Sequence, residues 1–160
     1  MAHFRAPLIF LSLLLTGCSE RSADVWMSQI ALPCGDKPNC VSTLDKREDF
    51  SLSPFVLTPK GMDDWAAIKQ VALTLPGAKL ADQATHYLHI EATSKVFRFI
   101  DDLEIAQTGD HLDVRSASRI GYYDFGVNRK RAEMLRERLI QNGLIVNKQS
   151  FDNSYHLDLY

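Results

Sequence analysis

The sequence lacks most of the residue patterns that metal, redox or nucleic-acid chemistry would need. It contains only three cysteines among 160 residues, and no phosphate-cradling glycine loop or catalytic triad is recognisable. The formal net charge is −2, so there is no excess of positive charge for general binding to nucleic acid. We therefore expect no bound metal, no cofactor and no nucleic-acid partner.

Long apolar runs are also scarce, and the one that stands out lies at residues 8–15. It is too short to span a bilayer as a helix but has the length of a signal-peptide core. Residues 15–18 read Leu-Thr-Gly-Cys, which resembles the lipobox of bacterial lipoprotein precursors. The resemblance implies cleavage before Cys18 and a diacylglycerol on its thiol. The alternative is an ordinary secretory signal peptide in which Cys18 is incidental.

A lipidated Cys18 would anchor the mature chain to a membrane, because two or more acyl chains hold a protein there stably. Ser19 follows it, at a position where lipoproteins retained at the inner membrane often carry aspartate, so the resemblance favours the outer membrane. We expect residues 1–17 to be a signal peptide, residues 18–31 a lipidated tether and residues 32–160 a single periplasmic domain.

The other two cysteines, Cys34 and Cys40, are expected to form a structural disulfide. A close isolated pair in an oxidising compartment favours a disulfide, and the Gly and Pro between them let a short loop bring the Cα atoms within bridging distance. A zinc site would need further thiols or an adjacent histidine. A redox-active pair would more usually have two intervening residues. The bridge would clip an irregular arm that spans residues 32–59.

Two amphipathic helices are predicted. The first begins at Thr58-Pro59, an N-cap residue followed by proline, and ends before Pro76-Gly77. The second runs from Asn128, as its N-cap, to Asn142. Apolar residues at helical spacing form their buried stripes, namely Met62, Trp65, Ile68, Ala72 and Leu75 in the first helix and Ala132, Leu135 and Leu139 in the second.

Alternating apolar residues predict three consecutive antiparallel strands at residues 86–92, 96–106 and 111–118. A last strand is expected near residues 155–159. The chain is therefore predicted to have an α+β fold. An antiparallel sheet, made of a three-stranded meander and a C-terminal strand, would carry both helices on one face.

The turns between the strands predict their register. A two-residue turn at residues 109–110 places Glu104 opposite Arg115. A tight turn at residues 94–95 would place Glu91 opposite Arg98. Both registers match acids with bases and apolar side chains with apolar ones.

One carboxylate interrupts an otherwise apolar strand face. Asp101 lies on the side of the second strand that also carries Phe97, Phe99, Leu103 and Ile105, and the register places it opposite Ser118. A buried carboxylate must be paired, or its pKa must rise. Partners are available, because residues 115–131 carry five basic side chains and one acid.

Three of those cations, at positions 129–131, fall in the first turn of the second helix, where the helix dipole disfavours positive charge. Compensation could come from Asp101 and Asp124 within the protein, or from an anionic ligand bound beside the free backbone N–H groups of the helix start. No residue is assigned a catalytic role, because no nucleophile–base pair is visible. The candidate ligand-binding residues are Asp101, Arg115, Ser116, Ser118, Arg119, Asp124, Asn128 and Arg129.

Three functions fit this pattern. The leading hypothesis is a non-catalytic periplasmic module that binds an anionic small molecule or an envelope protein through this loop and helix start. The second is a hydrolase in which Asp101 acts as general base and Arg115 or Arg119 stabilises developing negative charge. The third is a purely structural salt-bridge network.

Three stretches of the chain carry a family resemblance that covers most of the domain. They are Cys34 with residues 38–42 (Pro-Asn-Cys-Val-Ser), residues 97–102 (Phe-Arg-Phe-Ile-Asp-Asp), and residues 115–119 (Arg-Ser-Ala-Ser-Arg) followed by Gly121, Asp124, Gly126, Asn128, Arg129 and Arg131. On these residues the chain resembles the domain of unknown function 1499 family. Its members are mostly bacterial envelope lipoproteins, and the resemblance implies no established reaction, substrate or cofactor.

Overall fold

The computed structural model describes residues 30–147 of the chain. The signal peptide, Cys18, most of the tether and the strand expected near residues 155–159 lie outside this range. No helix within residues 30–147 is long and apolar enough to cross a membrane. The elements are β1 (Cys40–Ser42), β2 (Phe55–Val56), α2 (Pro59–Asp63), α3 (Trp65–Leu73), β3 (Ala78–Ala84), β4 (Tyr87–Thr93), β5 (Ile100–Thr108), β6 (His111–Ser118) and α4 (Val127–Gln141).

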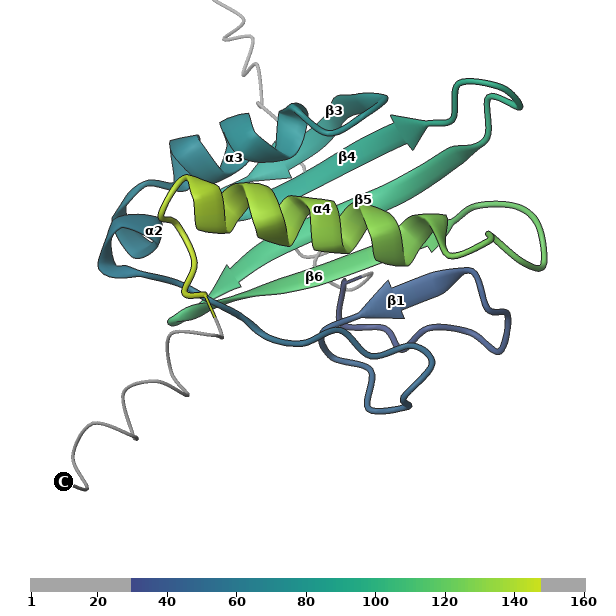
Figure 1. The fold of residues 1–160 in the computed structure, drawn as a ribbon, viewed down its shortest axis with the longest axis horizontal. Coiled ribbons are helices and arrows are strands. Elements are labelled where there is room, and N and C mark those ends of the chain that lie inside the picture. Colours follow the sequence, from purple (N-terminus) through teal and green to yellow (C-terminus); the bar gives the residue numbers. More distant parts are fainter. Residues whose placement is uncertain (1–29, 148–160) are drawn as a thin grey trace, which may run out of the picture.

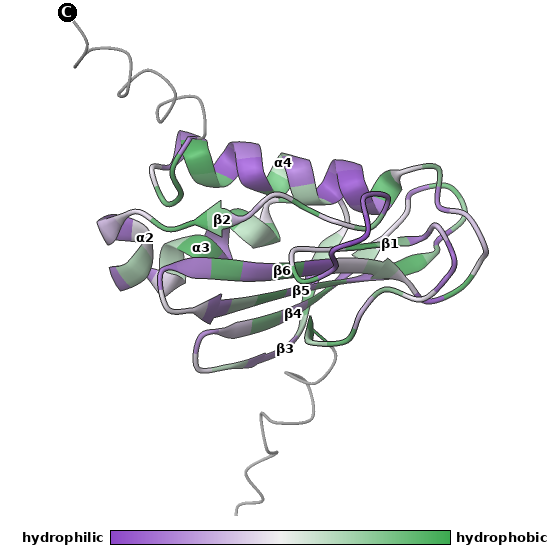
Figure 2. Ribbon diagram, turned by 90° about the horizontal axis from the view of Figure 1, so that it is seen from below, coloured by the Kyte–Doolittle hydropathy of each residue, from purple (hydrophilic) through white to green (hydrophobic). Residues whose placement is uncertain are grey.

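The described residues form an α+β fold, as predicted. The antiparallel sheet has six strands in the order β1-β6-β5-β4-β3, with β2 also pairing with β6. Helices α3 and α4 lie next to each other on one face of this sheet (Figure 1). In Figure 2 the sheet is seen nearly edge on, with α4 above it. The buried core between the two layers includes Ile68, Leu103, Ile105, Leu135 and Leu139.

The predicted register of the hairpin between β5 and β6 is confirmed. Glu104 lies opposite Arg115, and Asp101 lies opposite Ser118. Gly109 has φ +60° in the connecting turn, a left-handed conformation that glycine adopts without the steric cost of a Cβ atom. The turn chemistry therefore fixes this register locally.

The predicted register between β4 and β5 is wrong by four residues. Glu91 lies opposite Asp102 rather than Arg98. The strand β5 begins at Ile100, so residues 94–99 form a loop in place of the tight turn expected at residues 94–95. Because strand side chains alternate with a period of two, a shift of four leaves every residue that remains in the two strands on its predicted face.

The observed register is favoured by burial at the centre of the sheet. It places Ile90 opposite Leu103 and Leu88 opposite Ile105, and all four side chains are fully buried. Because β5 begins only at Ile100, Phe97, which was expected in the core, lies in the loop and is 73% exposed.

The sheet contains three strands that the sequence pattern does not predict, β1, β2 and β3. Both β1 and β2 belong to the arm that we expected to be irregular, and they pair along the outer edge of β6. An uncovered edge would leave a row of unpaired backbone groups. The predicted disulfide between Cys34 and Cys40 is present, with Cα atoms 5.6 Å apart, and within the arm it links Cys34 to the first residue of β1.

The single helix predicted from Thr58 to the Pro76-Gly77 stop is divided into α2 and α3. Thr58 caps α2 as predicted, because its hydroxyl accepts the N–H of Gly61 at 3.0 Å. Asp64 then ends α2 and caps α3, where its carboxylate accepts the N–H of Ala67 at 2.9 Å. The break leaves Met62, expected in the buried stripe, exposed.

Candidate functional site

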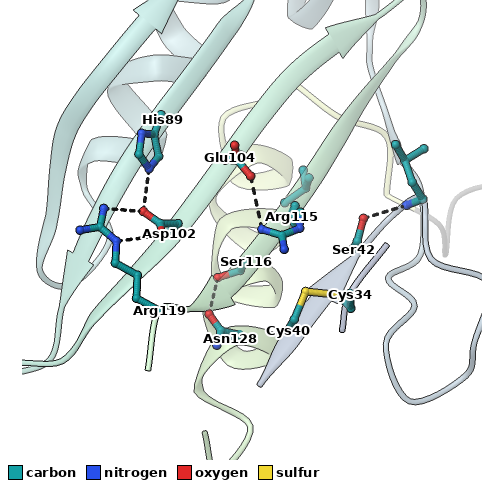
Figure 3. A network of polar contacts seen from close by, with 12 residues as sticks. Cys34, Cys40, Ser42, His89, Asp102, Glu104, Arg115, Ser116, Arg119 and Asn128 are labelled. Atoms are coloured by element: carbon teal, nitrogen blue, oxygen red, sulfur yellow. Dashed lines mark hydrogen bonds and ion pairs between the residues drawn. A yellow bond between two sulfur atoms is a disulfide. The ribbon is translucent and has the colours of Figure 1, made fainter. Parts of the chain in front are cut away.

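The candidate ligand-binding residues do not converge on one site, because β6 directs them to opposite faces of the sheet. Ser116 and Ser118 face the helices together with Asp101, whereas Arg115 and Arg119 make their contacts on the other face. Figure 3 shows this division, with Arg115 and Arg119 on one side and the Ser116–Asn128 contact beneath the strand. The candidates therefore form two separate polar networks.

The network beneath the helices is centred on Asn128, which is fully buried. Its Oδ1 atom accepts hydrogen bonds from the hydroxyl of Ser116 and from Nη1 of Arg131, both at 2.7 Å. Its Nδ2 atom donates to the hydroxyl of Ser118 at 2.9 Å and to Oδ2 of Asp124 at 2.8 Å. One side chain thus joins β6, the β6–α4 loop and the first turn of α4.

Asp101 reaches this network through Arg131. Its Oδ2 atom lies 2.6 Å from Nη2 of Arg131, and the two side chains are only 6% and 9% exposed. A buried ion pair of this kind needs good geometry and further hydrogen bonds to offset its desolvation. Arg131 supplies them through Ser116 and Asn128. Arg131, which was not among the candidates although it belongs to the family motif, is therefore the partner that the buried carboxylate required.

The start of α4 is capped differently from the prediction. Gly126 is the N-cap residue and Asn128 lies inside the first turn, so Asn128 is not the cap. The carboxylate of Asp124 accepts the N–H groups of Gly126 at 2.8 Å and of Asn128 at 2.9 Å. These backbone donors, which could have held an external anion, are therefore bonded to an internal carboxylate.

Arg129 is also engaged within the protein. Its guanidinium donates to the backbone carbonyls of Ser51 at 2.8 Å and of Asp49 at 2.9 Å. Both acceptors belong to the arm between β1 and β2. Arg129 therefore fastens the arm to α4, and it also lines a cleft of about 630 Å³ between the arm and the β6–α4 loop.

The second network lies on the opposite face of the sheet. Glu91 and Asp102 are directly opposed like charges, a pairing that destabilises a sheet unless a cation compensates it. Arg119 bridges them, with Nη2 at 2.6 Å from Glu91 and 2.7 Å from Asp102. His89 contacts the same Asp102 carboxylate at 2.6 Å.

These contacts shift the pKa values of Asp102 and His89, and they raise the pKa of Arg119. Burial alone would raise the pKa of Asp102, but hydrogen bonds from His89 and Arg119 outweigh it and lower the pKa to about 2. The hydrogen bond to Asp102 raises the pKa of His89, against the opposing effect of burial. The correct strand register would have revealed this cluster, because only that register brings Glu91 and Asp102 together.

Arg115 contacts another carboxylate on this face, the buried Glu104. Its Nη1 atom lies 3.5 Å from Glu104, whose other oxygen accepts the Tyr87 hydroxyl at 2.9 Å. Burial raises the pKa of Glu104. Arg115 and Arg119 therefore neutralise internal acids.

The exposed apolar side chains gather elsewhere, at one end of the molecule. We call this region the loop end and define it as residues 94–99, between β4 and β5, together with residues 119–127, which run from the end of β6 to the first residue of α4, and Lys130 in the first turn of that helix. Of the twelve large hydrophobic residues that are exposed within residues 30–147, eight lie here: Val96, Phe97, Phe99, Ile120, Tyr122, Tyr123, Phe125 and Val127. The two loops are neighbours, because both line one apolar groove of about 350 Å³.

Unpaired cations accompany these apolar residues. Lys95, Arg98 and Lys130 are exposed, and among the residues that the structure describes none of them forms an ion pair. Lys95 and Lys130 line the same second groove, of about 250 Å³, beside α4. Sequence reasoning missed the loop end because the shifted register placed Phe97 and Phe99 in the core.

Within residues 30–147, no group of three or more histidine, cysteine or acidic side chains could hold a metal ion. A comparison with curated proteins gives no match for the chain. Residues 31–139 match a family described as protein of unknown function (DUF1499), and this range contains both polar networks and the loop end. The chain therefore belongs to the DUF1499 family.

Proposed function

We propose that this protein is a non-catalytic binding module of the bacterial periplasm, anchored through Cys18 to the outer membrane, that contacts an anionic envelope component with its loop end. The observation that carries the proposal is the concentration of exposed apolar side chains and unpaired cations at that end. Large exposed apolar patches on soluble domains mark interaction sites. The cations give such a surface a preference for a negatively charged partner.

The internal networks support this surface in a structural role. Asp124 and Asn128 hold the β6–α4 loop against β6 and the start of α4. Arg131, the fifth residue of α4, joins that helix to β5 through Asp101. The internal bonds of residues 115–131 thereby hold the loop end in position. The cations that we propose to contact the partner are Lys95, Arg98 and Lys130 rather than Arg115 and Arg119.

A hydrolase that uses Asp101 as general base gains no support from the geometry. A general base must reach a substrate proton within hydrogen-bonding distance. The Asp101 side chain is 6% exposed and is bonded to Arg131 at 2.6 Å. Arg115 and Arg119, the proposed charge stabilisers, lie on the opposite face of the sheet.

The proposal is tested by photo-crosslinking in intact cells. A photoreactive amino acid replaces Phe97 or Tyr123 at the loop end, and His111 at the other end of β6 serves as the matched control position. We expect a crosslinked envelope component at positions 97 and 123 that is absent at 111 and decreases in the triple variant Lys95→Glu/Arg98→Glu/Lys130→Glu. Equal crosslinking at all three positions would contradict the proposal. An amount of crosslinked product that is unchanged in the triple charge-reversal variant would contradict it as well.

A further inference from the structure

We infer that the anionic component is a lipid bilayer surface: the loop end inserts its apolar side chains between anionic headgroups while its lysines contact the phosphates. This inference rests on the proposed function and names its partner. Phe97 and Phe125, at 73% and 77% exposed, occupy two separate loops at the same end of the sheet. Side chains on loop tips can enter the boundary between headgroups and acyl chains, as apolar faces do in interfacial proteins.

The composition of the first loop fits that boundary. Residues 94–99 read Ser-Lys-Val-Phe-Arg-Phe, with two cations, three large apolar side chains and no acid. In the second loop, Tyr122 and Tyr123 are exposed, and tyrosine is enriched at membrane–water interfaces because its ring is apolar and its hydroxyl is polar.

The two acids that line the apolar groove, Asp101 and Asp124, are both bonded within the protein. Asp124 is bonded to the first N–H groups of α4, and Asp101 is paired with Arg131. Arg119 is exposed as well but is paired with Glu91 and Asp102, so the cations of the loop end without an ion pair are Lys95, Arg98 and Lys130, although the whole chain has a net charge of −2. This local reversal of sign complements a membrane that contains anionic lipid.

The apolar groups and the lysines are arranged as two adjoining zones. The apolar groove contains Phe97, Phe99 and Phe125, and the groove beside α4 contains Lys95 and Lys130. The two grooves share Ser94 and Val127 in their walls. A lipid could therefore place its acyl region against the aromatic zone and its phosphate against the lysines.

The backbone holds the aromatic rings in place at some conformational cost. Arg98 and Phe125 have φ values of +54° and +57°, in the left-handed region that non-glycine residues seldom occupy. The rings of Phe97 and Phe99 lie 5.6 Å apart, and those of Tyr123 and Phe125 lie 5.0 Å apart. Each loop thus presents a preformed aromatic pair.

The experiment measures insertion directly in the full chain. The protein carries Trp26→Phe, so that Trp65 in α3 remains as an internal reference, and a tryptophan replaces either Phe97 or, as the control, His111. Each form is reconstituted into vesicles of brominated phosphatidylcholine with or without phosphatidylglycerol. On the anionic vesicles we expect the tryptophan at position 97 to lose about half of its fluorescence or more, because bromine quenches at the acyl boundary. The tryptophan at position 111 should keep its fluorescence.

Charge variants test the role of the lysines in the same vesicles. Lys95→Glu/Lys130→Glu should restore the fluorescence at position 97, whereas the matched reversal Lys46→Glu/Lys79→Glu, at exposed lysines outside the loop end, should not. Absence of quenching at position 97, equal quenching at 97 and 111, or equal quenching without phosphatidylglycerol overturns the inference. A charge-dependent protein crosslink at position 97 without quenching would overturn the membrane inference and leave the proposed function standing. Loss of both signals would overturn both.

Discussion

At the scale of single residues, Asp101 and Arg131 show how a charged side chain can be buried in the core of a small domain when an opposite charge pairs with it. Asp101 lies on the strand face that packs beneath α4, where an unpaired carboxylate would be strongly destabilising. Arg131, the fifth residue of α4, reaches it at 2.6 Å. The cations that oppose the helix dipole are therefore explained individually: Arg131 pairs with Asp101, Arg129 binds carbonyls of the arm, and Lys130 remains exposed.

The substitution Asp101→Asn should lower the free energy of unfolding by about 3 kcal/mol, because it leaves the buried Arg131 guanidinium without a counter-charge. Chemical denaturation monitored by Trp65 fluorescence measures the change. The double variant Asp101→Asn/Arg131→Met serves as the control and should recover most of the loss. A loss below about 1 kcal/mol in the single variant would show that the pair is not a structural requirement.

His89 and Asp102 give the folded state a defined pH dependence. The pKa of His89 is raised above 6.5 by its hydrogen bond to Asp102, so its stabilisation is complete below pH 6.5 and is lost as the pH rises through the raised value. The pKa of Asp102 is lowered to about 2 from 3.8, so its stabilisation is present above pH 3.8 and is lost as the pH falls toward 2.

We therefore expect the free energy of unfolding to decrease between pH 6 and pH 9, as His89 loses its proton and its charge-assisted bond to Asp102. Urea titrations at several pH values measure this slope. The variant His89→Gln should show a flatter slope over the same range, because His86 and His111 are common to both proteins. An unchanged slope in the variant would assign the pH dependence to other groups.

At the scale of elements, the backbone of α2 closely approaches the segment that follows α4. A Cβ atom on Gly61 would lie 1.9 Å from the carbonyl oxygen of Leu144, in the segment that follows α4. That segment also accepts the backbone N–H of Thr58 at 3.1 Å. The short helix therefore depends on glycine at this position.

The substitution Gly61→Ala should destabilise the protein by about 2–3 kcal/mol, because the backbone carbonyl cannot move aside as a flexible side chain would. Gly35→Ala is the matched control, since a Cβ atom there would meet nothing within 4 Å, and its effect should stay below about 0.5 kcal/mol. The difference in denaturation midpoints between the two variants measures the contact. Equal effects would show that α2 can shift away from Leu144.

The two β-hairpins show which element boundaries were predictable. The β5–β6 turn contains Gly109 and an adjacent aspartate, and this local chemistry determines the register correctly. The β4–β5 connection contains neither glycine nor asparagine. Two registers that differ by four residues satisfy the alternation of apolar residues in β4 and β5 equally well. Burial of Leu103 against Ile90 decides between them, and that contact becomes visible only once the sheet is assembled.

At the scale of the whole molecule, segments that are far apart in the sequence pair and pack against one another. The arm supplies β1 and β2 to the outer edge of β6, Arg129 of α4 binds the arm, and the disulfide closes the arm on itself. On the other face of the sheet, Ile30 packs on Tyr87 and Ala106. This shared packing leaves the loop end as the region where exposed apolar side chains accumulate, and both functional tests address that region.

The sequence by itself determined the α+β class, the family, the disulfide, the β5–β6 register and the need of Asp101 for a cation. Each of these depends on local chemistry or on a period that a few residues establish. The tertiary structure alone decided that Arg131 is that cation, that Arg115 and Arg119 serve the opposite face, and that Phe97 and Phe99 lie at the surface. Those outcomes depend on which strands and helix turns become neighbours, and that choice is made by burial summed over the whole core rather than by any local pattern.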